Sequence, residues 1–513
     1  MAYYSMHAYD ADVWIPQFSG LRQSDDIASD LRFAIEAENV ETARGVLQPM
    51  AAPEMETFDD NKKIETIARF HRRWFDGTGS KDWVVVAAGG SIYYRQEDAD
   101  EWEAIDSQTT FTNNVWSFVT YEINPAGSLN PVDVLLMSNA DDGMIMIVPP
   151  YTADVSNPDW RIDLIDTRGD PSTQTFEERP KFGVIERYAE RIWGGSVAGE
   201  PDALYYSVPY EPDNWQQNNQ IPEDGGGKIQ QPSWDGDSFT ALRAFGDQLI
   251  AFKKNHIWRV LGTDPGQYTF KEQYGGGGPH PNTIAVENER ILMTERDGIS
   301  TYDGLSVSAF NRPSIEDYWK RINRARMDQM CAALFKHRYY LAIPMDGSEI
   351  NNALIVYNIE EGSFLLYTDI HIESLMATEE KLYATSSTIP GKIMTINYDS
   401  WETGASSGKR TMWKTAWIDF GRKSVAKGGY EIYFSPEVKG GPVTFRFSIE
   451  TEKKTKSKMV TVQTTTFKAK QKRIRFGGTS RRFRLIIETV SVPQNTVWRL
   501  LGGIQMVVEI DPD

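Results

Sequence analysis

The chain has 513 residues, with 54 Lys and Arg against 72 Asp and Glu, a formal net charge of −18. Apolar residues make up 40% and aromatic residues 12%, which excludes a largely disordered chain, and the length predicts two to four domains. Cys331 is the single cysteine, so an internal disulfide framework is excluded. No apolar run approaches the roughly 18–20 residues of a membrane-spanning helix, and residues 1–20 lack the features of a secretory signal. We therefore expect a soluble protein made in a reducing compartment, without a membrane anchor.

The charge is divided unevenly along the chain. Residues 411–513 contain 19 Lys and Arg against 9 Asp and Glu, a net of +10, whereas residues 1–410 contain 35 against 63, a net of −28. The overall acidity excludes a general nucleic-acid binder, which would carry a basic footprint. The division fits either two soluble domains of opposite charge or two parts that face different partners.

Short runs rich in β-branched and aromatic residues recur from about residue 63. The first unit joins Trp83–Ala88 to Ser91–Tyr94 through Gly89-Gly90, a two-residue connection typical of a β-hairpin. The second runs over residues 134–148 with a turn at residues 141–143. Five more units follow, at residues 183–215, 240–265, 283–304, 332–366 and 381–396.

These units repeat at roughly 30–50 residues and each holds three or four short strands, which is typical of β-propeller blades. We predict an all-β protein with a propeller of about six blades, give or take one, over residues 63–410. Residues 1–62 form an N-terminal arm in this interpretation. Two consecutive β-sandwiches remain an alternative, because they too give short strands with turns between them.

One short helix is predicted as an insertion between the fifth and sixth blades. Ser314 is a plausible N-cap, and Ile315, Tyr318, Trp319 and Ile322 fall on one helical face.

After residue 410 the pattern changes to about seven strands, of which 416–420 is the first. Phe445, Phe447 and Ile449 alternate with polar residues, which predicts an antiparallel β-sandwich over residues 411–513. A strongly basic loop is expected at residues 453–458. Its side chains are candidate contacts to neighbouring subunits or an adaptor: Lys453, Lys454, Lys456 and Lys458.

No catalytic, metal-binding or cofactor-binding motif is present, so we predict none of these sites. Cys331 borders apolar strand residues and is interpreted as a packing cysteine. Gly275–Pro279 joins two strand units and opens no helix, which favours a connector over a phosphate cradle. A glycosidase-type carboxylate pair drawn from different blades would not be visible in the spacing. Tyr205, Tyr206 and Trp215 could stack on sugars or fill the blade interior.

Several segments, in their order along the chain, resemble virion proteins of tailed bacteriophages. The stretch LRAFGDQLIAFKKNHIWRVLGT at residues 242–263, with 275–284 and 291–304, is similar to the tail nozzle or hub family, also called tail tubular protein B or packaged-DNA stabilisation protein. Further segments agree: residues 18–26, 37–50, 83–95 with Trp102, 312–322, 337–345 and 352–364. The resemblance covers most of the chain as a pattern of blades, with no catalytic signature.

The resemblance implies a structural protein of the phage tail, assembled in the host cytoplasm. The family would form a homo-hexameric ring below the portal and tail adaptor. Its central channel retains and conducts phage DNA during ejection, and its outside anchors tail fibres or spikes. The alternative is a propeller-type tail protein that binds or hydrolyses glycans. The tail length class stays open.

The acidic charge then has a possible role in a DNA channel. DNA carries one negative charge for about every 1.7 Å of its axis, so an acidic wall would repel it over a Debye length of roughly 8–10 Å. We expect acids of residues 1–410 to line the channel, and the basic part to contact acidic neighbours. Candidate acidic loop residues are Asp141, Asp142, Glu223 and Asp224.

Overall fold

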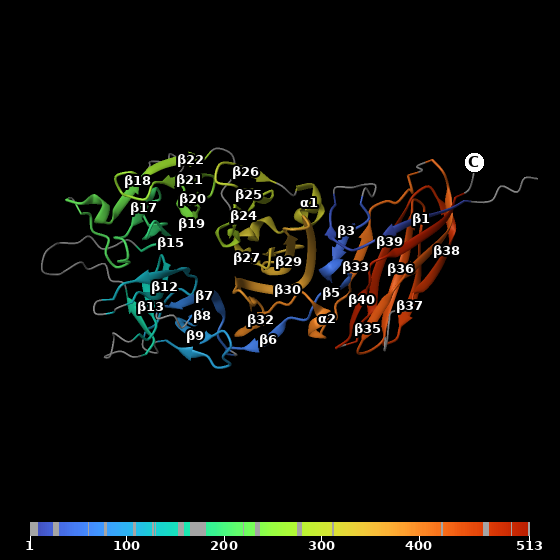
Figure 1. Cartoon of the computed structure of the whole chain (residues 1–513), viewed down its shortest axis with the longest axis horizontal. Helices are drawn as coiled ribbons and strands as arrows, with labels where there is room; N and C mark the ends of the chain where they lie inside the picture. The colour runs from blue at the N-terminus through green and yellow to red at the C-terminus, as the bar shows by residue number, and fades with distance from the viewer. Residues whose placement is uncertain are drawn as a thin grey trace, which may run out of the picture.

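The computed structural model describes residues 9–23, 30–59, 61–75, 79–105, 109–125, 128, 130–151, 159–164, 181–218, 220–230, 236–273, 280–309, 312–421, 424–464, 471–493 and 495–510. Within these ranges nearly all regular structure is β-strand, as predicted, and no helix is long and apolar enough to cross a membrane. The molecule is elongated, with small sheets in one half and longer C-terminal strands in the other (Figure 1).

Five four-stranded antiparallel sheets follow one another from residue 64 to residue 309. The predicted hairpin is confirmed, because Gly89 and Gly90 turn with φ of 59° and 78°, values that glycine adopts without strain. The strands of the five sheets are β7 (Ile64–Trp74), β8 (Gly79–Ala88), β9 (Ser91–Gln96) and β10 (Glu103–Ala104); β11 (Ser117–Ile123), β12 (Val132–Asn139), β13 (Gly143–Val148) and β14 (Arg161–Leu164); β15 (Val184–Tyr188), β16 (Arg191–Gly195), β17 (Ala203–Tyr206) and β18 (Gly227–Gln230); β19 (Phe239–Phe245), β20 (Gln248–Lys253), β21 (Ile257–Leu261) and β22 (Thr269–Gln273); β23 (Ala285–Glu287), β24 (Arg290–Glu295), β25 (Gly298–Tyr302) and β26 (Val307–Ala309).

Two further strand groups share the long strand β30 (Ser363–Ala377). Its first half pairs in the order β27 (Cys331–Phe335), β28 (Arg338–Ile343), β29 (Asn351–Asn358), β30. Its second half, from Ile372, pairs with β31 (Leu382–Ser386), which pairs with β32 (Lys392–Thr395). The N-terminal strand β6 (Glu54–Thr57) completes this last group by pairing with β32.

Neighbouring sheets bury their apolar faces against each other through separate clusters. Each cluster contains residues of two neighbouring sheets, for example Phe70 and Leu135, Tyr121 and Ile185, Trp193 and Leu249, Ile250 and Ile291, and Leu292 and Tyr339. A sixth cluster joins the last group to the first, because Tyr383 and Ile393 pack with Ile64 and Val84. Each sheet thus packs on two neighbours, which is propeller-like, whereas a sandwich sheet buries one face.

The C-terminal strands form two sheets that face each other. One has the order β33 (Met412–Thr415), β39 (Phe483–Ser491), β36 (Val443–Thr451), β37 (Thr455–Val462), and the other β1 (Tyr9–Ile15), β41 (Ile504–Ile510), β34 (Lys427–Phe434), β38 (Lys472–Ser480). The rings of Phe434 and Phe447 lie 4.4 Å apart between them. Two small pairs complete the strands: β4 (Val40–Glu41) with β5 (Gln48–Pro49), and β35 (Pro436–Lys439) with β40 (Val497–Leu500).

The described part of the N-terminal segment, residues 9–23 and 30–59, contributes strands to both halves of the molecule. Strand β1 enters the C-terminal sheet beside β41, and β6 completes the last propeller-like group. Between them, β2 (Gly20–Leu21) and β3 (Phe33–Glu38) connect β30 to β33. One sheet therefore runs without a break from β27 to β37, and the two halves are joined by backbone hydrogen bonds.

The predicted helix is present as α1 (Arg312–Lys320), but it begins before Ser314, so Ser314 is not its N-cap. The backbone leaves helical geometry at Ile315, with φ of −135°, and beyond this break the Gln23 side chain accepts a hydrogen bond from the Asp317 N–H at 3.0 Å. The predicted face is buried, including Tyr318 and Trp319. A second short helix is α2 (Ser400–Thr403).

The strand predicted at residues 416–420 is wrong. The strand ends at Thr415, Ile418 makes an isolated bridge to Phe483, and Phe420 turns the backbone with φ of 54°.

Candidate functional site

The predicted basic loop is a tight turn followed by an exposed edge strand. Lys453 and Lys454 lie in the turn between β36 and β37, which Thr451 closes by accepting from the Lys454 N–H at 3.1 Å. Lys456 and Lys458 lie in β37, so the expectation of a loop is wrong for them. The prediction of a loop rested on the polarity of residues 453–458. It failed for Lys456 and Lys458 because both faces of this strand are exposed, so no apolar residues alternate with the polar ones.

The four lysines divide by what their side chains contact. Lys456 donates a hydrogen bond to the Gly477 carbonyl in β38, and the Lys458 ammonium lies 5.8 Å from the Phe476 ring centroid. Both therefore lie across the seam between the two C-terminal sheets. Lys453 and Lys454 project at the hairpin tip and are exposed.

Near the tip of the β36–β37 hairpin, two arginines surround Trp417, a cluster that was not predicted from the sequence. The guanidinium carbons of Arg482 and Arg484 lie 4.8 Å and 4.2 Å from the Trp417 ring centroid. Arg482 also contacts Glu452 at 3.1 Å. Alternation in β39 places Arg484 and Ile486 on one face of the strand. This spacing in the sequence could have indicated that Arg484 lies on the less buried face. The tip of these hairpins is thus a cationic and aromatic surface.

The two aspartates of the β12–β13 turn are engaged in local hydrogen bonds. The Asp142 carboxylate accepts from the N–H groups of Thr112 and Asn113 at 2.9 and 3.0 Å, and from the Thr112 hydroxyl at 2.8 Å. The Asp141 carboxylate accepts from the Asn113 side-chain amide at 2.7 Å. Asp142 therefore fastens the preceding segment to the turn, which fits a structural role better than a channel surface.

Replacing Asp142 with Ala is expected to lower the free energy of unfolding by about 1–2 kcal/mol, because two backbone N–H groups lose their acceptor. Burial would raise the pKa of this carboxyl, but the hydrogen bonds from Thr112, Asn113 and Asn139 outweigh it and lower the pKa. The stabilisation is therefore complete above pH 3.8 and disappears as the pH falls through the lower folded-state pKa. Denaturant unfolding of D142A across this range measures it. Glu223→Ala, at an exposed site, should change stability by less than about 0.5 kcal/mol, and an equal loss in both variants would contradict the assignment.

Glu223 and Asp224 form a 3-10 turn (Pro222–Asp224), and both side chains are exposed. The buried Arg191 holds this turn from below, since its guanidinium donates to the carbonyls of Glu223, Gly225 and Ser207. The two carboxylates are thus displayed on a supported loop. Asp141 and Asp142 belong to a different sheet, in the turn between β12 and β13.

Other buried charges join neighbouring sheets. The Arg73 guanidinium contacts the fully buried Asp133 at 2.7 Å, and that of Arg95 contacts Glu56 of β6 at 2.9 Å. Lys253 forms an ion pair with Asp202. Each pair crosses from one sheet to the next, so these groups stabilise the packing of sheets.

Carboxyls with a raised pKa lie beside arginines in the described part. Burial raises the pKa of Glu186, with Arg243 opposing the shift from 3.9 Å, and burial raises that of Glu38, with Arg321 at 3.6 Å. Cys331 is buried, and burial raises the pKa of its thiol, which makes it a poor nucleophile. Among the described residues, no three His, Cys, Asp or Glu side chains gather to hold a metal ion.

The aromatic residues considered for sugar stacking pack inside the sheets. Tyr206 is buried against Trp193, with ring centroids 5.1 Å apart. Tyr205 and Trp215 are half-buried against Phe182, at 5.6 and 4.8 Å. This arrangement favours the blade-interior interpretation. The glycine-rich connector at residues 275–279 lies outside the described residues.

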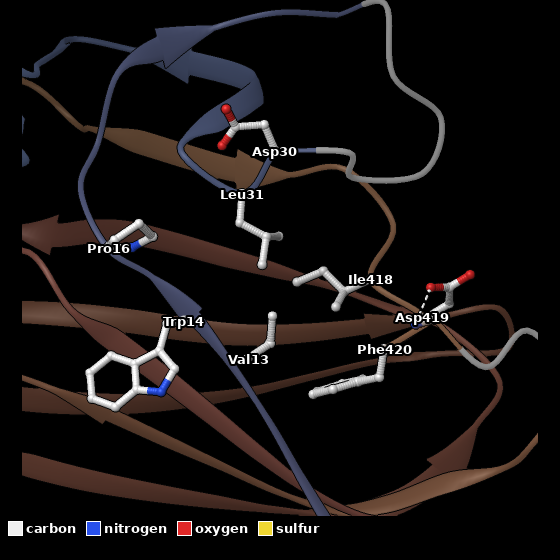
Figure 2. Close-up of a pocket in the computed structure, with 9 residues that line it drawn as sticks. Val13, Trp14, Pro16, Asp30, Leu31, Ile418, Asp419 and Phe420 are labelled. Carbon is white, nitrogen blue, oxygen red and sulfur yellow. Dashed lines mark hydrogen bonds between the residues drawn. The ribbon is translucent and has the colours of Figure 1, made fainter.

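An open groove of about 340 Å³ lies between β1 and the segments that come just before β3 and just after β33. Figure 2 shows the side chains of Val13, Leu31, Ile418 and Phe420 converging on it, with carboxylates at its margin. Trp14 lies at its border and is 50% exposed.

The comparisons with known proteins give no family. No family model matches the chain, and no curated protein matches it. Among solved structures, the chain is similar to one described as the AfRom2 CNH domain, with 9% sequence identity and a TM-score of 0.37. The match covers 68% of this chain and 100% of that chain. At this identity and score the likeness says nothing about function.

Proposed function

We propose that this protein is a structural subunit of a bacteriophage tail nozzle or hub, a ring whose channel retains and conducts DNA and whose outside anchors fibres or spikes. The observation that carries the proposal is the unbroken sheet from β27 to β37. It joins the acidic and basic parts through backbone hydrogen bonds, which suits a ring subunit with an acidic channel and basic contacts. The resemblance along the chain supports the same role.

The architecture within this proposal is a propeller of seven blades with a C-terminal β-sandwich. The five separate sheets give five blades, and β27 to β30 and β30 to β6 give the sixth and seventh. The seventh blade takes its outer strand from the N-terminal segment, which is a common way to close a ring of blades. Packing of Tyr383 against Ile64 supports this closure.

The hairpin tip is the best candidate for contact with an acidic neighbouring subunit or adaptor. Lys453 and Lys454 are exposed there, next to the arginines around Trp417. Complementary charge mainly accelerates docking and selects partners. On the acidic side, Glu223 and Asp224 remain candidates for the channel wall, whereas Asp142 is engaged in its own turn.

Mass photometry of the purified protein, alone and with its tail adaptor, tests the ring. We expect about six subunits, and the double substitution K453E/K454E should slow assembly about tenfold at low salt, because it reverses the charge of the docking surface. The matched control K254E/K271E places the same change on exposed residues of the propeller-like part and should assemble normally. A monomer in every condition that releases sugar from host capsule or lipopolysaccharide would favour the glycan-hydrolysing alternative.

A further inference from the structure

The two seams of the C-terminal sheets differ in their protection. At one seam the edge strands β37 and β38 are guarded by lysines, since Lys456 donates to the Gly477 carbonyl and Lys458 lies over Phe476. Inward-directed lysines are a common device against pairing with another strand. At the other seam the edge strand is β1, whose sequence YDADVWI contains no Lys, Arg or Pro.

Strand β1 has a free side in the described part of the chain. It pairs with β41 alone, and the sheet ends there. The facing sheet continues past β33 to β3, and Leu31, just before β3, and Ile418, just after β33, line the groove together with Val13 of β1. The groove therefore combines a free sheet edge with apolar side chains, which are the two features that an added β-strand uses.

The alternation of β1 specifies what such a strand should carry. Val13 points toward the groove, whereas Asp12 and Trp14 lie on the outer face, where the Trp14 indole N–H donates to the Asp12 carboxylate at 3.1 Å. Residues directly opposite each other on neighbouring strands share a face of the sheet. The added strand should therefore direct every second side chain, an apolar one, into the groove, and its other side chains should lie beside Asp12 and Trp14 on the outer face. A cation suits both outer positions, through the carboxylate and through the indole face.

We propose that the free edge of β1 and its groove bind an extended segment of a partner protein in which apolar and basic residues alternate. Main-chain hydrogen bonds to β1 would provide affinity, and the groove with Asp12 would provide specificity. Asp419, at the far margin of the groove, adds a second negative charge. The site concerns a single chain and does not depend on ring assembly, so it stands or falls separately from the proposed function.

The test is fluorescence anisotropy with the full-length protein and a fluorescein-labelled octapeptide that alternates Val and Lys. Two control peptides alternate Val and Glu, or carry Pro at the third Val. Both should bind at least tenfold more weakly, because one reverses the charge and the other removes a main-chain donor. Hydrogen exchange should slow at those β1 amides that point away from β41. Equal binding of the three peptides would overturn the proposal.

Variants of the protein separate edge pairing from general attraction to an acidic surface. Val13→Lys puts a charge into the groove and should abolish binding, and Asp12→Asn should weaken it several-fold and reduce its salt dependence. The matched control Thr461→Lys adds a lysine to the exposed outer face of β37 and should leave binding unchanged. Unchanged binding in both V13K and D12N would overturn the proposal. A second outcome would also overturn it: the protein binds none of the peptides but self-associates, and V13K abolishes this self-association. The groove would then be occupied by a second copy of the chain.

Discussion

Removal of residues 1–58 is expected to prevent the propeller-like half from folding stably. The deletion takes away β6, so β32 loses one of its two neighbouring strands and the buried Arg95 loses Glu56. An unpaired buried charge alone costs about 3–5 kcal/mol, a large fraction of the roughly 5–15 kcal/mol of a typical domain. Phe58 is lost too, and with it the packing on Tyr93 and Trp102. Limited proteolysis should cut within residues 64–104 and 363–395 of the truncated protein.

Removal of residues 1–15 is the matched control. This shorter deletion takes away β1, which pairs only with β41 in the described part, and leaves β6 in place. The propeller-like half should keep its protease resistance and thermal transition. If the longer deletion were as stable as the shorter one, β6 would not close the last group of strands.

The second large effect is expected at the contact between β4 and β28. Glu41 is fully buried, and its carboxylate accepts from Arg338 at 2.8 Å and from the Tyr367 hydroxyl at 2.6 Å. Burial and the adjacent carboxylate raise the pKa of Tyr367 well above its ordinary value, so it stays a hydrogen-bond donor. Arg338→Ala leaves the Glu41 charge buried without its cation and should cost about 3–5 kcal/mol in denaturant unfolding.

Two further variants show whether the buried charge is the cause. Arg44→Ala removes an ion pair with Glu402 whose side chains are 81% and 60% exposed, and should cost no more than about 1 kcal/mol. Glu41→Gln in the Arg338→Ala background should recover part of the loss, because the remaining buried group is then neutral. A similar cost for R338A and R44A would show that the burial of Glu41 is unimportant.

Local sequence patterns predicted the strands correctly where a short stretch of sequence determines the backbone conformation by itself. Gly89-Gly90 set the first hairpin, and the alternation of Phe445, Phe447 and Ile449 located β36. The helix face was also predicted, although its beginning was not, because Gln23, almost 300 residues earlier in the chain, bonds to the backbone on both sides of a break at Ile315. Residues 416–420 have strand composition, but the bridge to Phe483 and the turn at Phe420 interrupt it.

Long-range pairing was beyond the sequence patterns. Nothing in residues 54–57 indicates that they pair with β32, and nothing in residues 9–15 indicates β41, because pairing partners share no local signal. The same holds for the site: the spacing of Asp141-Asp142 suggested an exposed acidic turn, but the donors of Thr112 and Asn113 come from the segment before β11. The four lysines were predicted from a run of positive charge in the sequence. Only the pairing of β36 with β37 shows that Lys453 and Lys454 lie at the hairpin tip and that Lys456 and Lys458 lie at the seam between the sheets.

An electron cryomicroscopy map of the assembled protein, with its tail adaptor if assembly requires it, would test the proposed ring and its channel. We expect a ring of about six subunits, with a channel wall of net negative charge supplied by residues 1–410. The basic residues of 411–513 should lie at contacts to neighbouring subunits or the adaptor. A ring with a neutral or basic channel wall, or no ring at all in the presence of the adaptor, would contradict the proposal.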